Sequence, residues 1–245
     1  MRSLIAVLCC AFAAVLPQGA GAQTDIRAIL ADTSRPQEHR DSDAARKPAE
    51  VLAFLGVGSG ARVADLMTGS GYWTRLLVPL VGPTGRVYAG NNAFYKGYYG
   101  ETFDALLKEP KFANVVRIDG QVDALPLPKD ASLDAALMVL AYHDLLLGTE
   151  DRAAMNRAIF AALKPGGVFV VIDHAAAAGA PASTAESLHR IDEAIVVREI
   201  TAAGFRADGG APFLRNTADN HTASVFDPSV AGKTDRFVLK FVKPR

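Results

Sequence analysis

Two histidine–carboxylate pairs each follow a short apolar stretch of this sequence. His143-Asp144 is the first pair and Asp173-His174 is the second. Histidine is the side chain best suited to take a proton near neutral pH, and a neighbouring carboxylate increases its basicity. The pairs predict a proton-transfer site in which His143 is the general base, Asp144 orients it or contacts the substrate, and His174 is the reserve base.

The same side chains could instead bind a metal ion. Zinc, iron and manganese accept a mixture of nitrogen and oxygen ligands. Such a set is available in His143, Asp144, Asp173 and His174, with His189 as a further candidate. No two of these residues have the spacing of a known metal motif. A third interpretation is that they are hydrogen-bonded structural residues at the ends of strands.

A glycine turn precedes both pairs in the chain. The short apolar run from Val63 to Met67 holds one acid, Asp65, and Thr68-Gly69-Ser70-Gly71 interrupts it before Tyr72 to Val81 resumes at helical spacing. The pattern predicts a strand, a tight turn and a helix. Glycine lets the backbone approach a ligand closely, and the free N–H groups that open a helix favour a nucleotide or a carboxylate. An ordinary strand-to-helix turn is the alternative.

Further elements alternate along the chain. Strands are expected over 86–89, 115–118, 133–140, 168–172 and 236–242, with helices over 42–55, 150–163 and 187–203. Such alternation indicates an α/β fold with a doubly wound parallel sheet, in which ligands bind outside the carboxyl ends of the strands. The histidine–carboxylate pairs and the glycine turn all follow strands. We therefore expect them at one edge of the sheet.

Three segments have no regular spacing of apolar residues that would predict a helix or a strand. Residues 23–40 are polar and predict a loose N-terminal segment, and residues 205–227 predict an irregular one. Between the second and third strands, a glycine-containing loop is expected to carry a cluster of aromatic side chains, namely Phe94, Tyr95, Tyr98 and Tyr99. Such a cluster could pack on the surface or offer a face on which a flat ring stacks.

Composition limits the classes of function. The 245 residues are 50% hydrophobic, enough for one full-sized α/β domain. The formal net charge is zero and no dense Lys/Arg block occurs, so nucleic acid is not an expected partner. The sequence gives no signal for a partner protein or an oligomeric state.

The N-terminus has the three parts of a secretory signal peptide. Met1-Arg2-Ser3 is positive, Leu4 to Leu16 is apolar, and Ala20-Gly21-Ala22 forms a cleavage site after Ala22. We expect a signal peptide over 1–22 and a single mature domain over 23–245, without a stable membrane anchor, in the periplasm or outside the cell. Within that domain, residues 23–58 are expected to be a helical lid over the ligand site. Both cysteines, Cys9 and Cys10, lie in the leader, which excludes disulfides and thiolate chemistry from the mature protein.

The order of these motifs resembles the class I S-adenosylmethionine-dependent methyltransferases, from roughly Ala61 to Asp173. The resemblance is carried by the acid and glycine turn, by LPLPKDASLD before the fourth strand and by LKPGGVFVVID before and through the fifth, of which LKPGG is the most specific piece. An RPxxHRxxD motif, YHD after the fourth strand and a TDRFVLKFVKP ending are similar to a group of exported bacterial proteins described as predicted methyltransferases.

The resemblance implies a Rossmann-like, seven-stranded, mostly parallel sheet whose last strand is antiparallel, and S-adenosyl-L-methionine as the cofactor. It implies that the methionine part of the cofactor is framed by Asp65, Met67, Gly69, Ser70 and Gly71, that Asn91 holds the ribose hydroxyls, and that Gln121 and Val122 line the adenine.

Three of these positions depart from the family pattern. Met67 stands in place of the first glycine, Asn91 in place of the ribose-binding acid, and Gln121 in place of the acid after the third strand. One function that follows is methyl transfer to a small-molecule acceptor in the periplasm. Another is ligand binding without catalysis on a degenerate methyltransferase fold, and a third is a metal-dependent enzyme of another class.

Overall fold

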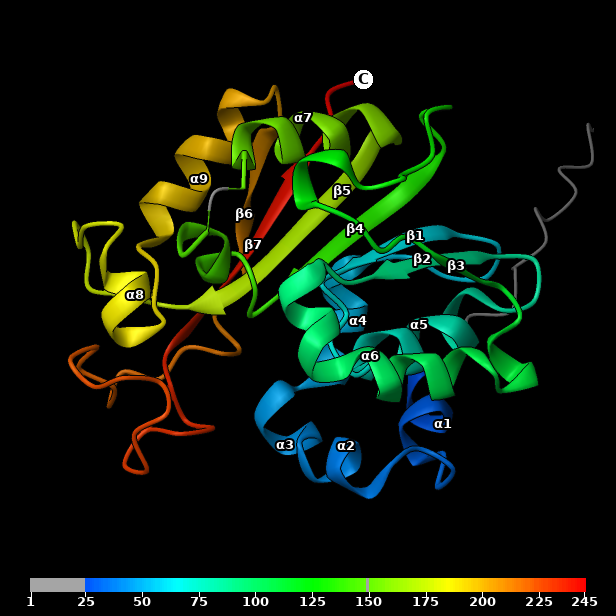
Figure 1. Ribbon diagram of the computed structural model, residues 1–245, viewed down its shortest axis with the longest axis horizontal. Coiled ribbons are helices and arrows are strands. Elements are labelled where there is room, and N and C mark those ends of the chain that lie inside the picture. The colour runs from blue at the N-terminus through cyan, green and yellow to red at the C-terminus, as the bar shows by residue number, and fades with distance from the viewer. Residues whose placement is uncertain (1–24, 149) are drawn as a thin grey trace, which may run out of the picture.

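The fold is one seven-stranded sheet with helices on both faces (Figure 1). The structure is a computed structural model that describes residues 25–148 and 150–245. The expected signal peptide lies outside the described residues, and both cysteines lie there with it. None of the helices in the described ranges is both long and apolar enough to cross a membrane.

The sheet has the doubly wound topology that the sequence predicts. Its strands are β1 (Arg62–Leu66), β2 (Arg86–Gly90), β3 (Val115–Arg117), β4 (Leu133–Val139), β5 (Leu163–His174), β6 (Arg206–Gly210) and β7 (Arg236–Val242). They lie in the order β3-β2-β1-β4-β5-β7-β6, parallel from β3 to β5, while β7 pairs antiparallel with β5 and β6. The prediction of a mostly parallel sheet with an antiparallel last strand is confirmed. The strand order reverses between β1 and β4, and ligands bind at such a reversal.

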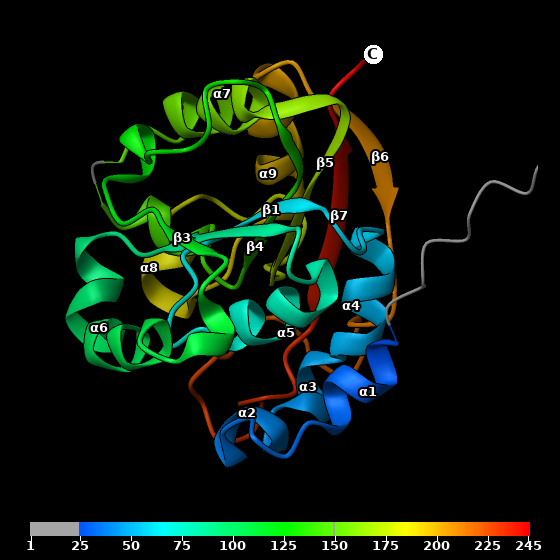
Figure 2. The same ribbon diagram turned by 90° about the vertical axis from the view of Figure 1, so that its right-hand side faces the viewer.

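Helices form a layer on each face of the sheet (Figures 1 and 2). They are α1 (Ile26–Ala31), α2 (Gln37–Asp41), α3 (Asp43–Arg46), α4 (Pro48–Leu55), α5 (Tyr72–Val81), α6 (Ala93–Leu107), α7 (Arg152–Ala162), α8 (Thr184–Leu188) and α9 (Glu193–Ala202), with 3-10 turns η1 (Pro110–Phe112), η2 (Val122–Ala124) and η3 (His143–Leu146). Residues of α4, α5 and α6 form the core on one face, and residues of α7 and α9 form it on the other.

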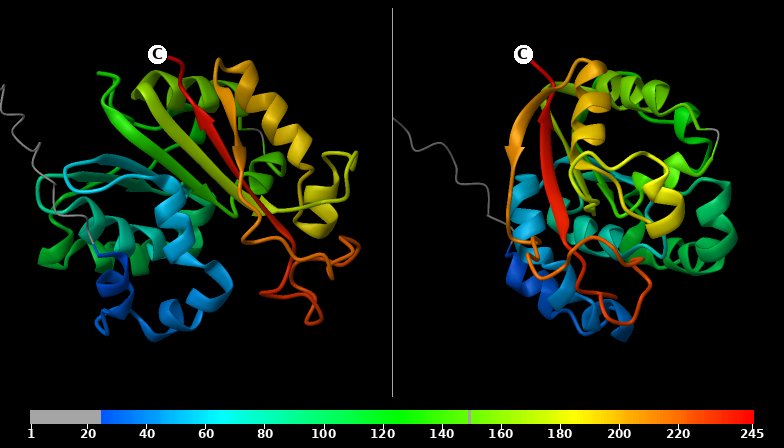
Figure 3. Two further views of the ribbon diagram at one scale, coloured as in Figure 1. Left: turned by 180° about the vertical axis from the view of Figure 1, so that it is seen from behind. Right: turned by 90° about the vertical axis from the view of Figure 1, so that its left-hand side faces the viewer.

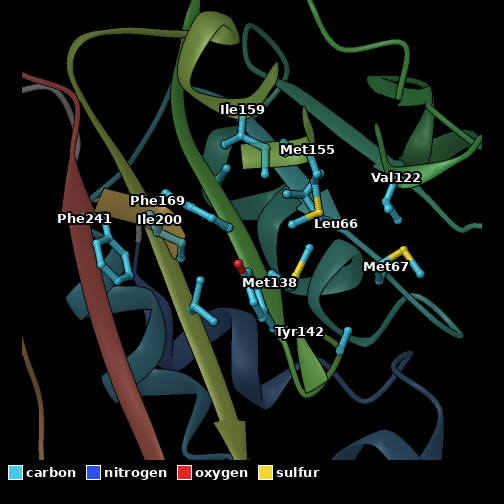
Figure 4. Packing of buried hydrophobic residues seen from close by; sticks show 14 of the residues in the cluster. Leu66, Met67, Val122, Met138, Tyr142, Met155, Ile159, Phe169, Ile200 and Phe241 are labelled. Atoms are coloured by element: carbon cyan, nitrogen blue, oxygen red, sulfur yellow. The ribbon is translucent and has the colours of Figure 1, made fainter. Parts of the chain in front are cut away.

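The strand β4 shows how the core fixes the sheet. Ala136 and Met138 face the α7 and α9 side, while Leu137 faces the opposite core, so the apolar run is continuous rather than alternating. On the first side, Met138 packs with Met155 of α7 and with Phe169 of β5 (Figure 4). Full burial of each such side chain stabilises the fold by about 1.5–3 kcal/mol. The close packing of β4 on both faces therefore fixes the position of the residues that follow this strand.

Two segments predicted to be irregular contain regular elements, although the second is irregular after β6 as expected. Residues 25–40 contain α1 and most of α2, and the Asp25 side chain caps α1 by accepting from the Arg27 N–H. Residues 205–227 contain β6, whose side chains are all exposed. An exposed edge strand that ends in two glycines has no apolar alternation to detect. After the loop from β6 (Figure 3), Arg236 at the start of β7 donates to the Ala45 carbonyl of α3, and the Phe213 carbonyl within the loop accepts from Lys47.

The aromatic cluster predicted to lie in a loop is part of helix α6. Asn92 caps this helix by accepting from the Tyr95 N–H. Gly97 and Gly100 lower the helix propensity of the segment, which explains the wrong prediction. The helix expected over 42–55 is also two helices, because Lys47 adopts a left-handed backbone (φ 46°) before Pro48.

The predicted boundaries of the later elements also change. β5 begins at Leu163 rather than at Val168, since the Lys164-Pro165-Gly166-Gly167 stretch bulges within the strand. Asp173-His174 therefore ends this strand instead of following it. The helix expected over 187–203 is α8 and α9, separated by a break at His189.

Candidate functional site

The turn after β1 has a left-handed backbone at three alternate positions. Met67, Gly69 and Gly71 have φ angles of 57, 60 and 87°. Such a backbone destabilises a residue with a side chain by roughly 1–2 kcal/mol. Met67 nevertheless adopts it, and its buried side chain packs in the core beside Val122 (Figure 4). The substitution of the first glycine by methionine therefore keeps the backbone path of the turn.

Asp65 stabilises the turn through hydrogen bonds to two threonine hydroxyls. It is buried at the end of β1, and its Oδ2 accepts from the hydroxyls of Thr68 and Thr74, each at 2.6 Å. Burial raises the pKa of this carboxyl to about 6, although both hydroxyls oppose the shift. The carboxylate expected to frame a cofactor thus joins the turn to α5.

Asn91, directly after β2, binds the backbone of the turn through two hydrogen bonds. Its Oδ1 accepts from the Gly69 N–H at 2.9 Å, and its Nδ2 donates to the Gly69 carbonyl at 3.1 Å. An ionised aspartate could not make the second bond, because it has no donor. Both polar atoms of Asn91 thus support the turn, whereas the sequence assigned them to the ribose hydroxyls.

The two residues predicted to line the adenine differ in burial. Val122 is fully buried in the core, while Gln121 is exposed just before η2. Sequence reasoning missed Asp119, whose Oδ1 accepts from the Asn91 N–H at 3.0 Å. Its Oδ2 pairs with Arg117, and the hydrogen bonds and these charges lower the pKa of Asp119 although burial raises it. An acid is therefore present after β3, two residues before the expected position.

Helix α6 lies between the turn and the first histidine pair. The Tyr99 ring is 3.8 Å from the point where a Cβ on Gly69 would lie. Tyr95 donates its hydroxyl to Asp144 Oδ2 at 2.7 Å. Phe94 and Tyr98 on the same helix are 58% and 72% exposed. The aromatic cluster thus has one side on the site and one side in solvent.

The N-terminal segment packs against the same turn. His39 Nε2 lies 3.0 Å from the Ser70 hydroxyl. Arg35 binds Asp43 with both terminal nitrogens, and Asp43 also accepts from the Tyr72 hydroxyl at 2.6 Å. These bonds anchor the RPxxHRxxD motif on the start of α5. Whether the segment opens and closes as a lid stays a prediction.

His143 lies between two carboxylates. Asp173, which is fully buried, accepts from the His143 backbone N–H at 2.8 Å and lies 2.7 Å from Nδ1. Nε2 is 3.1 Å from Asp144 Oδ1. Burial alone would lower the pKa of His143, but Asp173 and Asp144 outweigh it and raise the pKa to about 10. The imidazole is then protonated at neutral pH, so the general-base role predicted for His143 requires that it first lose this proton.

Two more histidines surround this group. His174 Nδ1 lies 2.7 Å from the Thr234 hydroxyl, and burial lowers the pKa of His174 to about 4, which leaves the ring neutral at pH 7 and makes it a weak base. His189 Nδ1 lies 3.4 Å from Asp144 Oδ1. The rings of His174 and His189 are centred 5.8 and 5.5 Å from that of His143. The structure thus brings together every residue that the sequence grouped as a possible metal set.

A cavity of about 520 Å³ lies at the opposite edge of the sheet. Its lining includes Arg75, Arg86 and Lys111, and Arg86 is the first residue of β2. Doubly wound sheets bind ligands at the carboxyl ends of their strands. The turn after β1, Asn91 after β2 and His143 after β4 lie there, so we assign the candidate site to that edge rather than to this cavity.

Comparison with known proteins finds similarity of sequence and of fold. No protein-family model matches the chain. A demethylmenaquinone methyltransferase of Lactococcus lactis subsp. lactis (strain IL1403) is 33% identical over 125 residues, which are 51% of this chain and 46% of that protein. The chain therefore spans less than half the length of this curated relative.

Solved structures extend the likeness to most of the chain. A SAM-dependent methyltransferase from Aquifex aeolicus has a TM-score of 0.56 and 21% identity, and the match covers 80% of this chain and 89% of that one. The [4+2]-cyclase SpnF has a TM-score of 0.60 and 18% identity, with 82% and 81% covered. These likenesses show the fold of the SAM-dependent methyltransferases.

Two glycines of the turn should differ in their effect on stability. A Cβ on Gly71 would lie 2.4 Å from Leu106 Cδ1 in the core, whereas one on Gly69 would meet only the Tyr99 ring at 3.8 Å. Gly71→Ala should therefore lower the free energy of unfolding by about 2–4 kcal/mol, and Gly69→Ala by about 1 kcal/mol. Urea denaturation measures both. Equal losses would contradict the packing described for Gly71.

The protonated state of His143 should appear in the pH dependence of stability. Because its folded pKa is raised from 6.5 to about 10, the charged ring contributes stability that is fully present below pH 6.5 and is lost as the pH rises toward 10. His143→Gln should lower the free energy of unfolding by about 3–5 kcal/mol at acidic pH and by less near pH 10. Denaturant titrations of both proteins across this range test it. A difference that does not change with pH would exclude a stabilising charge.

Proposed function

We propose that this chain is a class I S-adenosylmethionine-dependent methyltransferase that acts on a small-molecule acceptor. The observation that carries the proposal is the left-handed turn from Met67 to Gly71 at the carboxyl end of β1, in a sheet with the strand order β3-β2-β1-β4-β5-β7-β6. The similarity to the Lactococcus lactis methyltransferase supports it. The N–H groups that open helix α5, directly after the turn, suit the carboxylate of the methionine part of the cofactor.

Features beside the turn fit a bound nucleoside. The space at Gly69 is limited by one aromatic ring, that of Tyr99, which could stack on a flat base. Glu150 accepts a hydrogen bond at Oε1 from the side chain of Asn92, the residue that follows Asn91. Its other oxygen, Oε2, is buried and has no hydrogen-bond partner among the residues that the structure describes. A carboxylate there can accept ribose hydroxyls, the role that Asn91 has lost.

The residues after β4 and β5 would handle the acceptor. The cofactor, when bound, supplies an electrophilic methyl group, and the protein mainly positions the reactants. A hydroxyl acceptor must also lose a proton. His174 is neutral and is the candidate for taking that proton, although its lowered pKa makes it a weak base. The protonated His143 ring holds Asp144 as an anion that orients the acceptor.

We place this activity in the periplasm. The support is the leader pattern of residues 1–22, which would export the chain with no cysteine left in the mature part. S-adenosylmethionine is made in the cytoplasm, so an exported enzyme needs a supply of the cofactor outside it.

Ligand binding without catalysis is the second candidate. It is favoured by Asn91, whose side chain is bonded to Gly69 and not free for the ribose, and by Met67 in place of a glycine. The fold itself does not decide, since a [4+2]-cyclase shares it.

Calorimetric titration with S-adenosylmethionine and S-adenosylhomocysteine tests the proposal. We expect micromolar binding, on the order of 8 kcal/mol. Gly69→Val should weaken it at least tenfold, because the side chain would enter the cofactor site. Gly232→Val is the matched control: Gly232 also has a left-handed backbone (φ 73°), and nothing lies within 4 Å of its Cβ position.

Each outcome of this titration has a clear meaning. No binding to the folded wild-type protein, or equal affinity in both valine variants, would contradict the cofactor site. If the cofactor binds, release of S-adenosylhomocysteine in the presence of a small-molecule extract separates methyl transfer from binding alone.

A further inference from the structure

Three potential metal ligands converge beside His143. One ligand atom each from His143, Asp144 and His189 lie within 4.8 Å of one another. We propose that these residues form a binding site for a divalent transition-metal ion. Two imidazoles and one carboxylate are a donor set that zinc and iron(II) accept, and they leave positions open for water or for an oxygen of the acceptor.

The distances between the ligand atoms suit one ion. Asp144 Oδ1 lies 3.1 Å from His143 Nε2 and 3.4 Å from His189 Nδ1. A tetrahedral ion with bonds of about 2.0–2.1 Å holds neighbouring ligand atoms about 3.3 Å apart. The two histidine nitrogens lie within 4.8 Å of each other, so an ion can bind all three atoms once His189 moves closer to His143.

The remaining polar atoms of two ligands are already held. Nδ1 of His143 faces Asp173 at 2.7 Å, which leaves Nε2 directed toward the cluster, where an ion would displace the proton between Nε2 and Asp144. A carboxylate on the far nitrogen of a metal-bound histidine fixes its tautomer and increases its affinity. Asp144 Oδ2 likewise accepts from Tyr95 at 2.7 Å, so that Oδ1 is the oxygen that faces both histidines. Such outer support is typical of metal sites.

His189 is placed there by an unusual backbone. It follows α8 in the left-handed region, with φ 51°, where a residue with a side chain is disfavoured. Its N–H donates to the Ala185 carbonyl, and its ring packs on the edge of Phe226, with centroids 4.7 Å apart. Methyl transfer as proposed above does not require His189. A metal ion gives this strained position a function.

The cluster is accessible from one side. The side chain of His143 is 4% exposed, that of Asp144 17% and that of His189 29%. An ion can therefore enter past His189 while His143 stays in the protein interior. Metal binding itself does not depend on the proposed methyl transfer. Only the idea that the open positions take an acceptor oxygen rests on it.

Titration of chelator-treated protein with Co²⁺ and with Zn²⁺, in the absence of any adenosyl compound, tests the site. We expect one ion per chain and the visible absorption of Co²⁺ bound to nitrogen and oxygen ligands. His189→Gly should weaken binding at least tenfold. Glycine suits the left-handed backbone, so this variant should stay folded. Asp144→Asn should also weaken binding, because it removes the charge of one ligand.

His221→Ala is the matched control. His221 also pairs with an acid, Asp235, at 3.0 Å, outside the proposed site. It should bind the metal as the wild-type protein does. The proposal is overturned if the wild-type protein binds no stoichiometric ion, if His189→Gly binds as tightly as wild type, or if His221→Ala loses as much affinity as His189→Gly. Cofactor titration is measured separately, so either proposal can fail without the other.

Discussion

The buried carboxylate of Asp173 is the interaction on which the candidate site depends. It has no exposed surface, and it faces the His143 ring and accepts from the backbone N–H groups of His143 and His174. A buried charge destabilises a protein unless it is paired and hydrogen-bonded. These contacts satisfy it, and they connect the end of β5 to the turn that follows β4. The ring of His143 is thereby fixed with Nε2 toward Asp144, and the other side chains are arranged around it.

The turn after β1 is held by a comparable set of bonds. Its departures from the family pattern are compensated within the structure. Met67 takes the left-handed backbone that a glycine would take, and Asn91 binds both the N–H and the carbonyl of Gly69. Helix α6 links the two halves of the site, because Tyr99 lies at Gly69 and Tyr95 binds Asp144. A nucleotide on the turn and an acceptor at the histidines would thus share one wall.

The sequence predicts the frame of this site well. Apolar runs located the strands from β1 to β5 and β7, and a parallel sheet then places the residues after them at one edge. The partners of those residues were less predictable. Sequence neighbours suggested that His143 pairs with Asp144, and it does, but they also suggested that Asp173 pairs with the His174 ring. The Asp173 carboxylate instead lies against the His143 ring, from the neighbouring strand β5. Likewise, neither the backbone of Met67 nor the position of His189 follows from hydrophobic spacing, because both depend on a left-handed residue. The edge strand β6 has no buried side chain, and α6 holds two glycines, so neither gave a usable pattern.

Hydrogen–deuterium exchange with and without saturating S-adenosylhomocysteine tests the central claim most directly, that the carboxyl edge of β1 and β2 binds the cofactor. The account predicts slower exchange of the backbone amides from Thr68 to Thr74 and from Asn91 to Tyr95. Exchange that stays unchanged at both segments, or that slows only around the cavity near Arg86 at the opposite edge, would contradict it.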